Sequence, residues 1–524
     1  MTRLALLFLA ACSTGSHESP DTTSTSDTGS GDWESDTDTD ADSDTDTDAD
    51  SDADSDTDTD SDTDADVDTG ESSDTDTDDT DDTDDTDEDA CDDATPVVLF
   101  LSPDDSNSTS SPAQLRDAML DGRTTLGDVP IRTWEFFNYY AFDYPRTDDA
   151  VTVTPSLARL DDRRFVLQIG VASQTVTVDE REPLNLVLAV DTSGSMSAVM
   201  ETVRDIGDAI ASSLREGDTV SIVEWNTENT VRLLELGVSG PDDPALLAAI
   251  AELESNGGTN LDAGLQAAYE IAERTFDDTR INRVVLISDG GANVGVTSSD
   301  LIAAQAGAAN EEGIYLVGIG VGTPSSYSDV LMDTVTDLGR GASLFISSPA
   351  EAERQLTGDG FLRVMDVAWR DVAVELDLPP GFTIERFSGE EYSTDHREIE
   401  PQNLAPDDAM VFYQTLSTCA PELANDDAVL TVRVTYEDPI TSARHTTEAT
   451  ARLGDLLGGD TGLLDKGTAI YAYAEALKAC QGRSASSWPA LLAPARAAVE
   501  RAEASNPGDV DLAELREIIE AMGG

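Results

Sequence analysis

Histidine is nearly absent from this chain of 524 residues, whose only three are His17, His396 and His445. A serine nucleophile needs a neighbouring base, and none of these histidines lies near the serine-rich motif described below. The Gly-x-Ser-x-Gly nucleophile elbow and the Gly-Lys-Ser/Thr tripeptide of phosphate-binding loops are missing as well. We therefore do not expect an enzyme.

Basic residues are scarce, with 30 Lys and Arg against 107 Asp and Glu and a net charge of −77. Phosphate binding depends on Lys and Arg, so nucleic acid is excluded as an expected partner. Residues 21–93 alone hold 32 Asp and 3 Glu without one Lys or Arg, in repeats such as DTDTDADSD. A segment with so little apolar surface and so much like charge predicts a disordered acidic tether over residues 12–93.

Long hydrophobic runs are also missing. A helix needs about 18 consecutive apolar residues to span a bilayer, and the sequence contains no such stretch. The chain opens with Arg3 and the short apolar run LALLFLA, as in a secretory signal. Leu9-Ala10-Ala11-Cys12 resembles the lipobox of bacterial lipoproteins, which implies cleavage of residues 1–11 and lipidation of Cys12. The residue after the cysteine is Ser13 rather than an Asp, and in this the sequence resembles lipoproteins that are sorted to an outer membrane. An ordinary cleaved signal peptide is the alternative.

Cysteine is limited to four positions, and no Cys-x-x-Cys or Cys/His cluster suggests zinc. If Cys12 carries a lipid, then Cys91, Cys419 and Cys480 remain for an oxidising compartment. One disulfide is expected. Cys419 with Cys480 is the candidate pair, although the sequence does not fix the pairing.

Strand and helix patterns alternate between residues 184 and 360. Val/Ile/Leu-rich runs such as LNLVLAV (184–190), RVVLISDG (283–290) and IYLVGIGVG (314–322) are typical of parallel strands buried on both faces. Amphipathic stretches, among them residues 261–276, 299–313 and 349–365, predict crossover helices between or after them. The pattern predicts a doubly wound α/β domain with a mostly parallel sheet.

Period-2 stretches flank this domain on both sides, at residues 164–178 and again beyond Met365. We expect these flanks to form one β-sandwich into which the α/β domain is inserted. Aromatic residues in WEFFNYYAFDY (134–144) are expected in a core, and the C-terminal stretches rich in Ala and Leu predict a helical hairpin or bundle. The expected organisation is a signal peptide (1–11), the tether (12–93), a helical and aromatic segment (94–150), the sandwich (151–182 and 366–453), the α/β domain (183–365) and C-terminal helices (460–524).

Acids and hydroxyls gather where the predicted strands end. The motif DTSGS follows the first strand, GGTN precedes a helix, and SDG closes a later strand. Because the carboxyl ends of parallel strands meet at one edge of a sheet, the side chains of these motifs should lie together. Oxygen ligands of this kind suit a hard cation such as Mg²⁺, with Mn²⁺ or Ca²⁺ as the alternatives. The candidate metal residues are Asp191, Ser193, Ser195, Thr259 and Asp289.

In order and spacing these motifs resemble the metal-ion-dependent adhesion site of von Willebrand factor A domains, and residues 97–522 resemble bacterial von Willebrand factor A lipoproteins. The resemblance implies that Ser193, Ser195 and Thr259 coordinate the metal largely directly. It implies that Asp191 and Asp289 act through waters. Asn260 and Asp262 are expected to cap or orient the following helix, and Asn293 is expected to be a loop residue.

The expected function is that of a lipid-anchored binding protein of the bacterial cell envelope, at the periplasmic or surface face of the outer membrane. Its metal would engage a carboxylate on a protein or glycan partner, and its only membrane contact would be the N-terminal lipid. The alternative is a structural scaffold subunit whose permanent contacts the metal stabilises.

Overall fold

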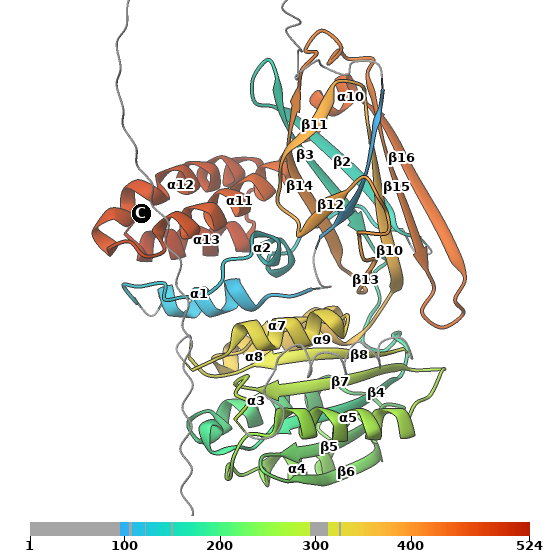
Figure 1. The fold of residues 1–524 in the computed structure, drawn as a ribbon, viewed down its shortest axis with the longest axis vertical. Helices are drawn as coiled ribbons and strands as arrows, with labels where there is room; N and C mark the ends of the chain where they lie inside the picture. Colours follow the sequence, from blue (N-terminus) through green and yellow to red (C-terminus); the bar gives the residue numbers. More distant parts are fainter. Residues whose placement is uncertain are drawn as a thin grey trace, which may run out of the picture. The chain divides into compact units, whose positions relative to one another are not determined.

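The computed structural model describes residues 95–103, 107–120, 122–147, 150–293, 313–323 and 326–523 (Figure 1). The predicted tether, Cys12 and nearly all of the helix expected over residues 299–313 lie outside these ranges. Within the described ranges, no helix is long and apolar enough to cross a membrane.

The α/β domain is built on a six-stranded sheet in the order β6-β5-β4-β7-β8-β9. All neighbours pair in parallel except β6, which runs antiparallel to β5 at one edge. Its strands are β4 (Leu184–Asp191), β5 (Thr219–Trp225), β6 (Asn229–Gly237), β7 (Ile281–Ser288), β8 (Ile314–Gly320) and β9 (Ser343–Phe345). Its helices are η1 (Gly194–Ala198), α3 (Met200–Ser213), α4 (Pro244–Ala251), α5 (Leu261–Arg274), α7 (Asp329–Leu338), α8 (Pro349–Leu356) and α9 (Gly358–Met365).

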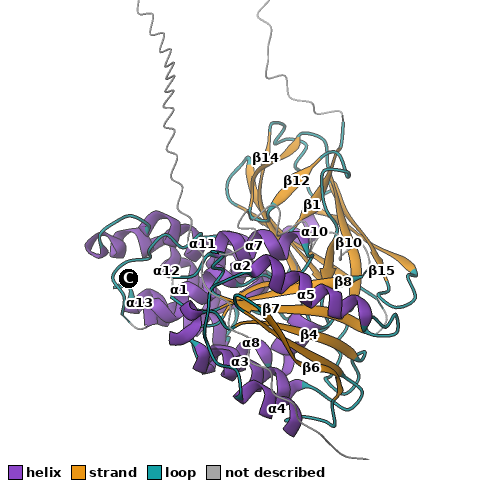
Figure 2. Cartoon of the chain, turned by 60° about the horizontal axis from the view of Figure 1, so that its bottom comes forward, coloured by secondary structure: helices purple, strands orange, loops and turns teal. Residues whose placement is uncertain are grey.

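Helices cover both faces of this sheet, as Figure 2 shows. Alternate residues of β4 enter different cores: Leu186 and Leu188 pack with α3, whereas Val187 and Ala189 pack with α5. A strand buried on both sides needs apolar residues at every position, which explains its unbroken Leu/Val/Ala run. The doubly wound fold predicted from the sequence is confirmed.

Two antiparallel sheets form the β-sandwich, in the orders β12-β1-β10-β15-β16, with β13 also on β10, and β11-β14-β3-β2. Since β2 and β3 precede the α/β domain and β10 follows it, the α/β domain is an insertion, as predicted. The first sheet contains β1 (Val97–Ser102), β10 (Trp369–Leu378), β12 (Glu391–Ser393), β13 (Gln402–Leu404), β15 (Val429–Glu437) and β16 (Arg444–Arg452); the second contains β2 (Thr152–Arg159), β3 (Arg164–Ala172), β11 (Phe382–Phe387) and β14 (Ala409–Thr418).

C-terminal helices pack with an N-terminal helical segment in one apolar core. Phe136 lies edge-on against Tyr473, and Phe137 stacks on Tyr413 of β14, so the aromatic segment is core material as expected. It packs against the C-terminal helices and the sandwich. The helices of this core are α1 (Ser110–Leu120), α2 (Thr133–Tyr139), α11 (Gly462–Cys480), η2 (Ala485–Ser487), α12 (Trp488–Ser505) and α13 (Val510–Ala521). The short helix α10 (Leu453–Leu457) follows β16 and packs instead on the core of the sandwich.

Three details differ from the sequence-based expectations, two in the secondary structure and one in the pairing of the cysteines. The first strand, β1, pairs with β10 and β12 in the sandwich, although its residues were assigned to a helical and aromatic segment. The helix expected over 349–365 is broken between α8 and α9 at Thr357, where the backbone is extended before Gly358 at φ +56°.

The predicted Cys419–Cys480 disulfide is wrong. Cys480 is a free thiol, buried at the end of α11 in the helical core, and its burial raises its pKa to about 11. Cys419 follows β14 in the sandwich and is disulfide-bonded, but not to Cys480. The two cysteines belong to different layers, which the sequence spacing does not reveal.

Candidate metal centre

Asp191 ends β4 and is fully buried. Both of its carboxylate oxygens are held by neighbouring donors: the Ser193 amide donates to Oδ1 at 2.8 Å, and the Ser288 hydroxyl donates to Oδ2 at 2.8 Å. Burial raises the pKa of Asp191 to about 6, and the nearby charge of Asp289 adds to the rise. The carboxylate is thus fixed in orientation, and no cationic side chain among the described residues pairs with it.

The two serines of the DTSGS motif lie in the turn after β4. Their hydroxyl oxygens are 3.1 Å apart, with Ser193 buried and Ser195 exposed at the start of η1. The Gly194 amide donates to the Gly257 carbonyl at 3.2 Å, which ties this turn to the next loop. Gly257 has φ +80°, a conformation that favours glycine. The glycines therefore permit the close approach of the two loops.

Thr259 is buried in the second loop and is gripped by Asn293. The Thr259 amide donates to Asn293 Oδ1 at 3.0 Å, and Asn293 Nδ2 donates to Thr259 Oγ1 at 3.3 Å. The backbone amide of Asn293 also donates to the Thr259 carbonyl at 3.1 Å. Sequence reasoning treated Asn293 only as a loop residue, and its orienting role was missed. Asn260 caps α5 through the Ala263 amide, as expected.

Asp289 follows β7, the strand next to β4, and only 6% of its surface is exposed. Its Oδ1 accepts the Gly291 amide at 2.9 Å. A Cβ placed on Gly291 would lie 2.9 Å from Asp289 Oδ1 and 3.9 Å from Thr259 Cγ2, so these two side chains flank the same glycine. All five predicted residues therefore gather at the carboxyl edge of β4 and β7.

The donor set of these residues fits a hard divalent cation, because it offers carboxylate and hydroxyl oxygens without a sulfur or imidazole. Within the described part of the chain, Asp191 forms no ion pair with Lys, Arg or His, and no group of three or more His, Cys, Asp or Glu that could hold a metal ion is found, so a metal at this site would depend on the hydroxyls beside the two carboxylates. A buried carboxylate without a cationic partner is costly unless a cation compensates it. The chemistry of the site thus agrees with the metal expected from the motif.

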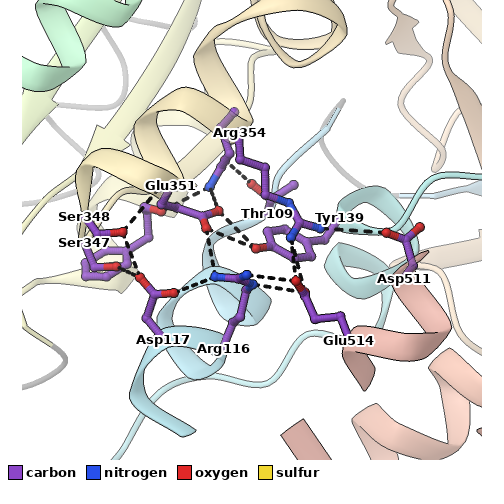
Figure 3. Close-up of polar contacts among 12 residues, drawn as sticks. Thr109, Arg116, Asp117, Tyr139, Ser347, Ser348, Glu351, Arg354, Asp511 and Glu514 are labelled. Carbon is purple, nitrogen blue, oxygen red and sulfur yellow. Dashed lines mark hydrogen bonds and ion pairs between the residues drawn. The ribbon is translucent and has the colours of Figure 1, made fainter. Parts of the chain in front are cut away.

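A second polar cluster joins α1, α8 and α13 (Figure 3). Arg116 pairs with Glu514 at 2.8 Å and lies 3.7 Å from Glu351, a carboxylate that is only 1% exposed. Glu351 also accepts the Tyr139 hydroxyl at 3.0 Å, and Arg354 donates to Glu514. Since the charged groups of this cluster are paired with one another, we interpret it as structural.

Residues 186–292 match the sequence profile of the von Willebrand factor type A domain. The inserted α/β part of the chain is therefore a von Willebrand factor type A domain, which the order of its strands and the position of its motifs also indicate.

Two curated relatives carry the sequence likeness further. The chain is 28% identical over 290 residues to the uncharacterized protein YfbK of Escherichia coli strain K12, covering 53% of this chain and 50% of YfbK. It is 27% identical over 218 residues to the uncharacterized protein sll0103 of a Synechocystis species, covering 41% of this chain and 49% of that protein. The chain thus spans about half the length of each of these relatives.

Among solved structures, a von Willebrand factor type A protein from Catenulispora acidiphila is 16% identical, with a TM-score of 0.45, and the match covers 72% of this chain and 98% of that one. The ArnB paralog VWA2 from Sulfolobus acidocaldarius is 14% identical, with a TM-score of 0.38, covering 71% of this chain and 97% of that one.

Proposed function

We propose that this protein is a cell-envelope binding protein whose von Willebrand factor A domain holds a divalent metal ion and engages an acidic group on a protein or glycan partner through it. The observation that carries the proposal is the meeting of Asp191, the two serines, Thr259 and Asp289 at one strand edge. No catalytic role is proposed for these residues.

Three neutral hydroxyls and two carboxylates would bind the metal ion in two different ways. Ser193, Ser195 and Thr259 would hold the metal, while Asp191 and Asp289 would orient bound waters from behind. A metal held mainly by neutral ligands supplies an electropositive point that attracts an outside carboxylate. Ser195 is exposed, so the site is open on the side from which a partner would approach.

Membrane attachment through Cys12 is a separate part of the proposal. It is supported by Arg3, the short apolar run and the LAAC sequence that ends at Cys12. The acidic residues 21–93 would then act as a spacer between an outer-membrane lipid and the folded domains. Replacing Cys12 with Ser should release the protein from the detergent phase; unchanged partitioning would contradict lipid anchoring.

Metal-dependent binding is tested with the Cys12→Ser chain, which keeps every folded domain. Calorimetry should detect binding of one Mg²⁺, and this binding should be lost in Asp289→Ala. Envelope proteins retained on the immobilised chain should be released by a chelator and recovered when Mg²⁺ is restored. Retention that is lost in Asp289→Ala but resists the chelator once formed would instead favour the scaffold subunit, whose permanent contacts the metal stabilises.

A further inference from the structure

The N-terminal segment α1–α2 precedes the sandwich strands β2 and β3, yet it lies along an edge of the von Willebrand factor A sheet. The Thr109 amide donates to the carbonyl of Ser343 in β9 at 2.8 Å, and the Ser343 amide donates to Ser108 Oγ at 3.0 Å. These bonds occupy the edge strand of the sheet and anchor the beginning of α1 there. A segment outside the domain is therefore fixed to it.

From this anchored position, three side chains of the segment converge on one carboxylate. Asp329, the first residue of α7, accepts Ser110 Oγ at 2.9 Å and Gln114 Nε2 at 2.8 Å through Oδ1. Its Oδ2 accepts Arg132 Nη2 at 2.7 Å. Asp329 is 7% exposed, so these hydrogen bonds form in a largely desolvated setting where they hold the carboxylate firmly.

The residue before Asp329 rests directly on the turn that carries the metal-site acid. The Ser328 amide donates to the Asp289 carbonyl at 2.9 Å. Gly290 has φ +72°, and a Cβ on it would lie 2.7 Å from the Ser328 carbonyl oxygen. The contact leaves no room for a side chain, so the start of α7 and the Asp289 turn are in close contact.

We propose that Asp329 is a positioning residue for the metal centre: the α1–α2 segment holds it through Ser110, Gln114 and Arg132, and it fixes the Asp289 turn through Ser328. The inference deepens the proposed function, since it makes metal affinity depend on a segment outside the von Willebrand factor A domain. Groups that orient a metal site from behind its ligands set a substantial part of its affinity.

A matched control lies one turn further along α7. Asp333 also pairs with Arg132, at 2.9 Å, but it lies four residues beyond Asp329 in the helix and does not adjoin Ser328. Asp329→Asn and Asp333→Asn remove the same charge from the same arginine. Only the first change acts at the residue that adjoins Ser328.

The experiment uses the full chain with Cys12→Ser and measures two quantities. The first is Mg²⁺ affinity by calorimetry; the second is hydrogen exchange, without metal, of the Ser328 and Gly291 amides that donate to Asp289. Asp329→Asn should weaken Mg²⁺ binding about tenfold and speed exchange at both amides by a similar factor. The Thr192 amide, bonded to Trp225 elsewhere on the same sheet edge, should exchange as before.

Asp333→Asn should change the affinity and both exchange rates by less than about twofold, although it removes the same charge. Should Asp329→Asn fail to fold, the combined Ser110→Ala and Gln114→Met changes remove only neutral donors and should produce a smaller effect in the same direction. Exchange at Ser328 and Gly291 that stays at the wild-type rate would overturn the inference. Absence of Mg²⁺ binding in the wild type would refute the proposed function, while the exchange rates would still decide the role of Asp329.

Discussion

Arg116 and Glu514, 398 positions apart, form a two-pronged ion pair that joins α1 to α13. Arg116 Nε donates to Oε1 at 3.0 Å and Nη2 donates to Oε2 at 2.8 Å, while Arg354 of α8 contacts the same carboxylate. The pair thus connects the N-terminal segment, the von Willebrand factor A domain and the last helix. Hydrogen bonding to Glu514 raises the pKa of Arg116 above its ordinary value.

Replacing Glu514 with Gln should lower the free energy of unfolding by about 2 kcal/mol, because two arginines lose the carboxylate that they share. Urea denaturation measures the change. The matched control is Glu503→Gln, which removes a more exposed pair with Arg516 and should cost less than about 0.5 kcal/mol. Equal losses for the two variants would show that the Arg116 pair is no stronger than a surface contact.

Glu135 in α2 gives the folded protein a dependence on pH. Burial raises its pKa to about 7, against the opposing effects of Arg132 and the Ser111 amide. The other ionisable groups near it are Asp329, Asp333, which shares Arg132, and Tyr327.

Since this carboxyl binds its proton more tightly when folded, its contribution to stability is complete below about pH 4.5 and is lost as the pH rises through about 7. Glu135→Gln removes that titration. The stability of the wild type relative to this variant should therefore fall by about 3 kcal/mol between pH 4.5 and 8, as measured by denaturation at each pH. Asp333, with a pKa of about 6, titrates in both proteins and largely cancels from the comparison. A difference that is constant with pH would contradict the prediction.

The sequence predicted that the five candidate metal residues lie together because their positions follow from a local pattern. Asp191 and Asp289 directly follow strands whose residues are all buried, and parallel pairing of β4 with β7 places the ends of these strands side by side. The hydrophobic runs identify the strands, and the parallel topology places the carboxyl ends of these strands at one edge of the sheet. No long-range information was needed.

Contacts between distant segments were not predictable in this way. Asn293 forms hydrogen bonds with Thr259, 34 positions away, and Arg132 donates to Asp329, 197 positions away. No periodic pattern in the sequence links the members of either pair. The separation of Cys419 from Cys480 likewise depends on which layer each helix or strand joins. Such pairings are decided by tertiary packing, which one sequence does not encode in a local pattern.

Asn293 should matter for binding more than its place in a loop suggests. Asn293→Ala removes both side-chain hydrogen bonds to Thr259 and should weaken Mg²⁺ affinity about fivefold, because the threonine hydroxyl loses its orientation. Calorimetry measures the affinity. Asn260→Ala serves as the control, since Asn260 caps α5 next to the same threonine and should affect stability more than metal binding. The prediction fails if the two variants bind Mg²⁺ alike.

Asp191 and Thr259 should separate metal binding from partner binding. Asp191→Ala removes the carboxylate between Ser193 and Ser288, so it should weaken both the metal and the partner by about tenfold or more. Thr259→Ala removes one neutral hydroxyl, so it should weaken Mg²⁺ about fivefold, as Asn293→Ala does, and should weaken the partner more strongly because it also alters the open face of the metal. Neither change should unfold a sheet that is held by its apolar strands.

Ser197→Ala is the matched control, because Ser197 is an exposed serine in the same turn and should leave both affinities unchanged. Calorimetry with Mg²⁺ and retention of envelope partners, with and without a chelator, provide the two readings. If a carboxylate on the partner binds the metal, a short acidic peptide should compete for retention, whereas its amidated form should not. Equal partner retention by wild type, Asp191→Ala and chelator-treated protein would show that partners bind elsewhere on the chain.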